Sequence, residues 1–185
     1  MREPRKTQTI LAGSLLLAHP AMRDPNFHRS VVLISAHGDD GAMGVVLNRP
    51  LDKQLGDLNG EFAAGPLAGI PVYRGGPVQS EQLILAAWQP EPLEGGFKLY
   101  FGIDIDRARA LQGKEGVRLR AFLGYSGWSK GQLENELRHN SWVVSPLQAE
   151  MLERHDGPAL WRSILGGLSP MWRLMAGESE DLEKN

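Results

Sequence analysis

Short apolar runs recur through the first two thirds of the chain, and their composition is typical of β-strands. Several are rich in β-branched or aromatic residues, and most end near Gly, Pro, Asn or Asp. Turn residues between the second and third runs predict a β-hairpin. The predicted strands are residues 10–18, 30–36, 42–48, 72–74, 82–88, 97–102, 117–123 and 142–145.

Helical spacing of apolar residues is concentrated in the last third of the chain. The clearest case, residues 159–165, places several large apolar side chains on one face. Residues 177–185 are polar and acidic, which predicts a disordered tail behind a single domain of residues 8–176. The other predicted helices are residues 51–58, a short one capped by Asp104 or Asp106 and ending at 111, 129–139 and 147–154.

The first 18 residues allow two interpretations. Three basic residues precede an apolar run, as in the n-region and h-region of a signal peptide. The run is short, contains Gly13 and Ser14, and is followed by Pro20 where a cleavage site is expected. The favoured interpretation is a buried strand over residues 10–18 that stays in the mature protein.

Composition narrows the class of protein. The chain has 185 residues, of which 42% are hydrophobic and 23% charged, as in a soluble globular domain. A net charge of −2 argues against direct nucleic-acid binding and against attraction to a membrane surface. With no cysteine and with scattered histidines, we expect no disulfide, no metal and no cofactor.

Four arginines that are close in sequence could form a basic patch for nucleic acid. They are Arg107, Arg109, Arg118 and Arg120. A patch for nucleic acid would need aromatic residues interleaved on the same face. Because residues 117–123 alternate apolar and polar side chains, Arg118 and Arg120 are predicted to face outward, on a solvated exterior.

The segment GYSGWSKGQLENE, residues 124–136, carries most of the candidate chemistry. Its glycines lie beside Tyr125 and Trp128, which predicts a strand-to-helix turn with exposed N–H groups between aromatic walls. Ser126 resembles the nucleophile of a hydrolase elbow, but Trp128 stands where the G-x-S-x-G spacing requires glycine. The alternative is a structural turn that packs around the tryptophan.

Two further features complete the candidate site. Ser129 and Gln132 have the spacing of a capping box that opens a helix. Gly75 and Gly76 form a second turn, which lacks the spacing of the known phosphate-binding loops. Since both turns combine glycines with aromatic or amide groups, we predict that they face each other across one surface cleft. The ligand-binding candidates are Asn48, Gly75, Gly76, Pro77, Tyr125, Trp128 and Gln132.

Two classes of function stay open. The first is a protein that binds a small molecule or a protein partner without chemistry, and it suits a set of glycine, amide and aromatic groups. The second is an enzyme acting on a small anionic metabolite. Its weaker candidate residues are Asp24, His28, Ser126 and Glu136. A titratable pair within hydrogen-bond reach in a cleft would favour the enzyme.

Four motifs in register resemble the AlgH/YqgE family of uncharacterised bacterial proteins. They are HPAMRDPNFHRSVVLISAH, GAMGVVLNRPL, VYRGGPV and GYSGWSKGQLENEL, and the resemblance extends from Gly13 to about Ser145. The resemblance implies one α+β domain, with a bifurcated, mostly antiparallel sheet that curls into a pseudo-barrel with flanking helices, in a cytoplasmic protein. No established catalytic residue comes with it. One member is named for an effect on alginate regulation, which points to a regulatory, transcription-related role.

Overall fold

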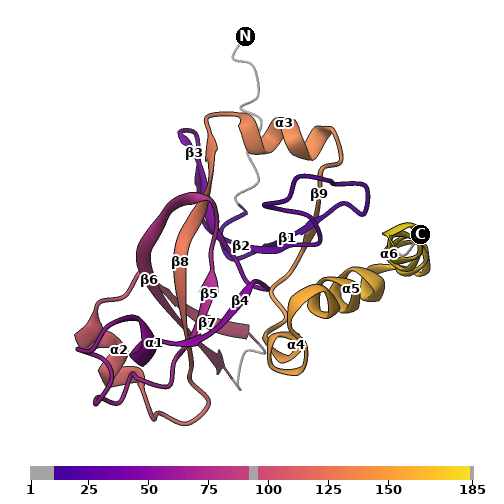
Figure 1. The fold of residues 1–185 in the computed structure, drawn as a ribbon. Helices are drawn as coiled ribbons and strands as arrows, with labels where there is room; N and C mark the ends of the chain where they lie inside the picture. Colours follow the sequence, from indigo (N-terminus) through magenta and orange to yellow (C-terminus); the bar gives the residue numbers. More distant parts are fainter. Residues whose placement is uncertain (1–10, 92–95, 184–185) are drawn as a thin grey trace.

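The computed structural model describes residues 11–91 and 96–183, and over these residues a mixed sheet curls into a half-barrel with helices around it (Figure 1). The strands are β1 (Leu15–Ala18), β2 (Val31–Gly38), β3 (Gly41–Val46), β4 (Pro50–Gln54), β5 (Pro71–Arg74), β6 (Val78–Glu91), β7 (Gly96–Phe101), β8 (Arg118–Ser129) and β9 (Trp142–Ser145). The helices are α1 (Leu55–Leu58), α2 (Ile105–Leu111), α3 (Gln132–Arg138), α4 (Ala149–Arg154), α5 (Gly157–Leu168) and α6 (Pro170–Glu183).

Strand β8 is shared by two arms of the sheet. Its first half pairs in parallel with β5 and in antiparallel with β6, through residues such as Ala121. Its last residues pair with β3, between Ser126 and Ser129. The strand order is β4-β5-β8-β3-β2-β1-β9, and β6 with β7 branches from it at β8. The bifurcated, mostly antiparallel sheet expected from the family resemblance is therefore confirmed.

The turn predicted from residue 124 onward is wrong, because β8 continues to Ser129. Gly124 has a φ of 75° inside the strand, a conformation that favours glycine and lets the strand pass from one arm to the other. At this point two backbones touch. A Cβ atom on Gly75 would lie 2.3 Å from the Gly124 carbonyl oxygen, and one on Gly124 would lie 2.5 Å from the Gly76 carbonyl oxygen.

Helix α5 fills the concave face of the half-barrel. Its apolar face, including Leu160, Trp161 and Ile164, is fully buried against residues of β1, β2, β3 and β8. The Trp161 indole N–H donates to the Ala18 carbonyl oxygen at 2.8 Å. The amphipathic helix predicted over residues 159–165 is confirmed. Among the described helices, none combines the length and apolar character needed to cross a bilayer.

Several predicted elements differ from the structure at their ends. The first strand covers Leu15–Ala18, with all four residues buried between β2 and β9, while Ile10 lies outside the described residues. Residues 50–54 form a strand, so the helix predicted at 51–58 shrinks to α1. Helix α6 covers Pro170–Glu183, and Ala176 on this helix is buried.

We expect Gly75→Ala to lower the free energy of unfolding by roughly 2–3 kcal/mol or more, because the new methyl group meets backbone that cannot move alone. Gly167→Ala is the matched control. Gly167 is exposed in α5 with no atom within 4 Å of a built Cβ, so this variant should gain up to about 1 kcal/mol. Urea unfolding measures both, and equal losses in the two variants would contradict the crossing.

Candidate functional site

Strand β8 places Arg120 inside the half-barrel, which corrects the prediction that it faces outward. Only 7% of the residue is exposed. Apolar and polar residues do alternate along this part of β8, but both faces of the strand are covered by other parts of the protein. Leu119, Ala121 and Leu123 face one core cluster, while Phe122, on the same face as Arg120, belongs to the cluster under α5. The sharing of a face with Phe122 was the sequence signal that could have indicated burial.

The Arg120 guanidinium lies close to two aromatic rings. Its central carbon lies 4.0 Å from the centroid of the Tyr73 ring and 5.1 Å from that of Trp88. Nη1 donates to the Leu47 carbonyl oxygen at 2.8 Å. Such cation–π contacts strengthen when the cation is removed from water. Tyr73 and Trp88 were both missed by the sequence analysis, because only pairing of β5 and β6 with β8 brings them to Arg120.

No carboxylate of the described residues lies within 4.0 Å of the Arg120 guanidinium. Burial lowers the pKa of Arg120, while the nearby Tyr73 and Asp156 act in the opposite direction. Arg120 is also the one charged residue among the buried residues of the described chain. Buried charges in proteins are normally paired, so this arginine is an exception that calls for a partner.

Tyr73 connects this arginine to helix α5. Its hydroxyl donates to Asp156 Oδ2 at 2.7 Å, and Asp156 Oδ1 accepts from the Gly157 N–H at 2.8 Å at the start of the helix. Burial raises the pKa of Tyr73 to about 12, with Arg120 opposing the rise and the bond to Asp156 adding to it. The phenol therefore stays protonated and donates throughout the physiological range.

Asn48, a residue singled out from the sequence, stands next to this network. It is 1% exposed, and its Oδ1 accepts from the Val31 N–H at 2.9 Å. Its Nδ2 donates to the carbonyl oxygens of Arg29 and Gly157, both at 2.9 Å. Asn48 thus ties the end of β3 to the start of β2 and of α5, which fixes the backbone around Arg120.

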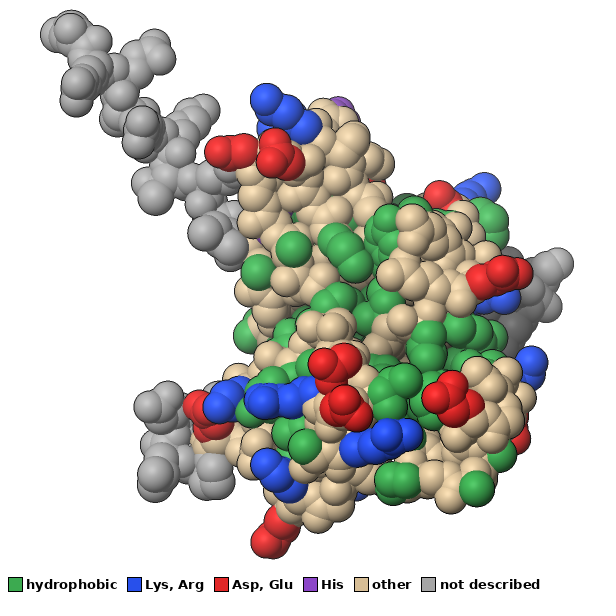
Figure 2. Space-filling view, turned by 90° about the vertical axis from the view of Figure 1, so that its left-hand side faces the viewer, with side chains coloured by type: hydrophobic (Ala, Val, Ile, Leu, Met, Phe, Trp, Pro, Cys, Tyr) green, Lys and Arg blue, Asp and Glu red, His purple; other side chains and the backbone are tan. Residues whose placement is uncertain are grey.

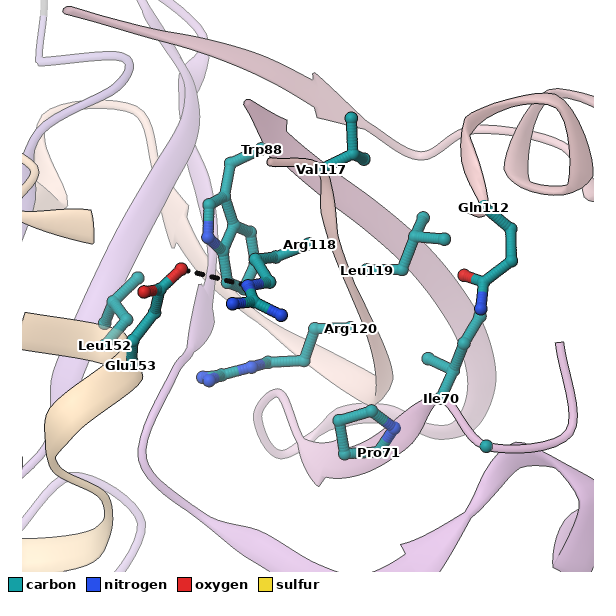
Figure 3. A pocket seen from close by; sticks show the side chains of 11 residues that line it. Ile70, Pro71, Trp88, Gln112, Val117, Arg118, Leu119, Arg120, Leu152 and Glu153 are labelled. Carbon is teal, nitrogen blue, oxygen red and sulfur yellow. Dashed lines mark hydrogen bonds and ion pairs between the residues drawn. The ribbon is translucent and has the colours of Figure 1, made fainter. Parts of the chain in front are cut away.

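A pocket of about 510 Å³ opens between β8, β6 and α4 (Figure 3). Its polar lining consists of Trp88, Gln112, Arg118, Arg120 and Glu153. Figure 3 shows the guanidinium groups of Arg118 and Arg120 on the side of Leu152 and Glu153, with Gln112 on the opposite side. Arg118 Nε donates to Glu153 Oε1 at 3.0 Å across the mouth.

Trp88 lines the same pocket and carries a polar group without a partner. Its indole nitrogen is buried and has no hydrogen-bond partner among the described residues. Leaving a buried donor without a partner costs about 1–3 kcal/mol. Figure 3 draws this nitrogen on the same side of the pocket as the two guanidinium groups. The pocket therefore combines a buried cation with an unsatisfied N–H donor.

The cleft predicted between the two glycine turns is wrong. The segments do meet, but Gly75 and Gly76 are buried against the backbone of residues 124–126, which leaves no space between them. Ser126 is fully buried and donates to the Gly75 carbonyl oxygen at 3.1 Å, so it is not an exposed nucleophile. Pro77 is exposed beside this crossing, and Tyr125 is half-buried against the main core cluster.

The aromatic candidate Trp128 is part of the core. It is 6% exposed and packs with Phe27 and Trp142, at ring-centroid distances of 6.3 and 6.0 Å. The packing role of Trp128 in the alternative interpretation is therefore confirmed, although the residue lies in strand β8 and not in a turn. Gln132 is exposed, and its Oε1 accepts from the Ser129 N–H at 3.0 Å, which is one of the two bonds of the predicted capping box.

The weaker candidates serve local structure in the described chain. Asp24 is exposed and accepts from the Asn26 N–H at 2.8 Å, as in an Asx turn. His28 Nδ1 lies 2.8 Å from the Met22 carbonyl oxygen. Glu136 accepts from the Trp142 indole N–H at 3.3 Å. Within the described residues, no group of three or more His, Asp or Glu side chains could hold a metal ion.

The four arginines do not converge on one surface. Arg107 lies over the Tyr100 ring, and Arg109 pairs with Asp106 at 3.7 Å. Arg118 pairs with Glu153, and Arg120 is buried. On the face drawn in Figure 2, Lys and Arg side chains are interspersed with Asp and Glu. Each of the four arginines therefore has its own local contacts, and together they do not form a continuous basic patch.

The fold and the pocket define a small α+β protein whose bifurcated half-barrel encloses a buried, unpaired arginine. The particular family follows from comparison. A family model described as "DUF179: AlgH-like" matches residues 15–172, and the chain belongs to this family of bacterial proteins. No specific function is established for it.

Individual relatives agree in sequence and fold. UPF0301 protein SCO2948 from Streptomyces coelicolor is 37% identical over 166 residues, which cover 84% of this chain and 85% of that protein. The solution structure of the AlgH protein from Pseudomonas aeruginosa is similar at a TM-score of 0.60 and 32% identity, covering 88% of this chain and 89% of that one. The crystal structure of DIP2367 from Corynebacterium diphtheriae shares the fold at a TM-score of 0.71 and 22% identity, covering 95% and 93%.

The Tyr73–Asp156 contact makes stability depend on alkaline pH. Because the pKa of Tyr73 rises from 10.0 to about 12 on folding, the stability it contributes is complete below pH 10 and is lost as the pH rises toward 12. We expect a tyrosinate absorbance phase centred near pH 12 that Tyr73→Phe abolishes. Persistence of that phase in the variant would assign it to another tyrosine.

Proposed function

We propose that this protein binds a small anionic ligand in the pocket between β8 and α4, with Arg120 as the principal contact. The observation that carries the proposal is the burial of Arg120 without a carboxylate partner among the described residues. Removing a guanidinium from water is costly unless charge and hydrogen bonds compensate it. A bound anion would supply both, and the pocket of about 510 Å³ lies within the usual size for small ligands.

The surroundings of Arg120 support binding by a prepared site. The two aromatic rings and the Leu47 carbonyl oxygen hold the guanidinium in one orientation before any ligand arrives. Asn48 and the Tyr73–Asp156 bond hold the backbone around it. A group that is positioned in advance loses less conformational entropy on binding, which raises affinity.

The enzyme alternative has one specific observation in its favour. Tyr73 and Asp156 are a titratable pair at 2.7 Å, and both line a second cavity of about 510 Å³ beside Pro71. An efficient general acid or base has a pKa near the working pH, whereas burial raises the pKa of Tyr73 to about 12. The pair therefore supports a structural role, and binding remains the better hypothesis.

A regulatory role and a cytoplasmic location are part of the same proposal. They rest on the family resemblance of the four sequence motifs, from which a transcription-related role was expected. A regulator of this kind would respond to the level of its ligand, because a ligand that binds one conformation of the protein shifts the population toward it. Leu152 and Glu153 of the short helix α4 line this pocket, so a bound ligand would be in a position to displace that helix.

A thermal-shift series tests the binding proposal. Benzoate, succinate, inorganic phosphate and adenosine monophosphate are each added to the wild-type chain. A ligand at 100 times its Kd stabilises the native state by about 2.7 kcal/mol, which corresponds to a rise in Tm of roughly 5–10 °C for a chain of this size. We expect at least one of these anions to give such a rise.

Two variants make the result specific to the pocket. Arg120→Gln should abolish the rise, whereas Arg74→Gln should keep it, because Arg74 is exposed on β5 outside the pocket. The Tm of each variant without ligand is the baseline. An anion-induced rise that is equal in both variants, or the absence of any rise in the wild-type chain, would refute the proposed site.

A further inference from the structure

We infer that the pocket selects a monoanionic carboxylate that carries an apolar body about as large as an aromatic ring. This inference rests on the proposed function and adds the chemical class of the ligand. It follows from four features of the pocket. They are the free edge of Arg120, the indole N–H of Trp88, the small amount of positive charge beyond that of Arg120, and the apolar side chains of the walls.

The free edge of Arg120 suits a planar acceptor with two oxygens. The guanidinium carbon lies 4.0 Å from the centroid of the Tyr73 ring and 5.1 Å from that of Trp88, so the two aromatic side chains take up part of the space around it. Nη1 donates to the Leu47 carbonyl oxygen, and no other hydrogen bond of this side chain is made within the described chain. The remaining N–H groups are left for a ligand, and a carboxylate can accept two parallel hydrogen bonds from one edge of a guanidinium.

Trp88 adds a third donor at the same end. Its indole N–H is buried and has no partner in the described part of the chain. Figure 3 shows its nitrogen on the side where the guanidinium groups of Arg118 and Arg120 lie. An indole donates but does not accept, so this group also requires an acceptor from the ligand. A carboxylate oxygen is such an acceptor.

The balance of charge favours one negative charge on the ligand over two. Arg118 is already neutralised by Glu153 at 3.0 Å. Asp156 lies close enough to Arg120 to influence its pKa electrostatically, although no ion pair joins them. The mouth therefore offers little positive charge beyond that of Arg120. A dianion such as phosphate would leave part of its charge uncompensated in a partly desolvated site.

The remaining walls are apolar and receive the body of the ligand. They consist of Ile70, Pro71, Val117, Leu119 and Leu152. Gln112 stands at the opposite side from the guanidinium groups and can accept or donate one hydrogen bond there (Figure 3). Burying apolar surface against these side chains adds affinity that a bare acetate or phosphate ion does not gain.

Titration calorimetry with three probes tests this class. Benzoate is the carboxylate with an aromatic body, benzamide is its neutral counterpart, and inorganic phosphate is the dianion. We expect saturable one-to-one binding of benzoate, with benzamide and phosphate weaker by at least about tenfold, the loss expected when a charged hydrogen-bonded pair is removed or mismatched. Acetate should also bind more weakly than benzoate.

Single substitutions test which side chains contact the carboxylate. Arg120→Lys keeps the charge but removes the edge that can donate two parallel hydrogen bonds. The affinity for benzoate should therefore fall by about fivefold or more. Trp88→Phe keeps an aromatic ring and removes only the N–H donor, with an expected loss of about threefold to tenfold. Arg74→Gln is the matched control and should bind as the wild type does. The indole N–H signal that Trp88→Phe removes should shift in the proton NMR spectrum on adding benzoate.

The outcomes separate the inference from the proposed function. If phosphate binds more tightly than benzoate and this binding needs Arg120, the carboxylate class is wrong and the anion site stands. If benzamide binds as well as benzoate, the charge-based selection is wrong. If no anion binds, both proposals fail. Should Arg120→Lys not fold, Trp88→Phe and the indole signal decide the question alone.

Discussion

The close crossing of two backbones at Gly75 and Gly124 is the constraint on which the rest of the molecule depends. Only because neither residue carries a Cβ can β8 run in parallel beside β5 and then pass on to pair with β3. The Gly75 N–H and carbonyl oxygen are both used there, by Leu123 and by Val46. One strand thereby holds both arms of the sheet, and the half-barrel closes around it.

A strand shared in this way has core on both of its faces, and this explains the buried arginine. Ordinary antiparallel sheets leave one face to water, where an arginine is placed at no cost. In β8 the second face lies under α4 and α5, so Arg120 is enclosed with Tyr73 and Trp88. Such a residue lowers stability unless it is used, and functional sites are where proteins keep groups of that kind.

The site is also linked to the helical side of the protein. Tyr73 reaches Asp156, Asn48 reaches Gly157, and Arg118 reaches Glu153, so three polar contacts connect the pocket to α4 and the start of α5. Asn48 and Tyr73 are themselves buried, and Tyr73 belongs to the same core cluster as the apolar face of α5. The polar contacts of the site are therefore continuous with the packing of that helix.

Local sequence pattern by itself determined the hairpin of β2 and β3, the strands around residues 72–74 and 82–88, and the buried face of α5. Each of these elements is recognisable from the spacing and type of its own residues. The family motifs determined the bifurcated sheet. Tertiary structure alone decided the candidate site. An alternating strand shows which side chains share a face but not whether that face meets water, so Arg120 was placed outside. Tyr73, Trp88 and Asp156 come from three other segments, and only the pairing of β5 and β6 with β8, and the docking of α5, brings them to it.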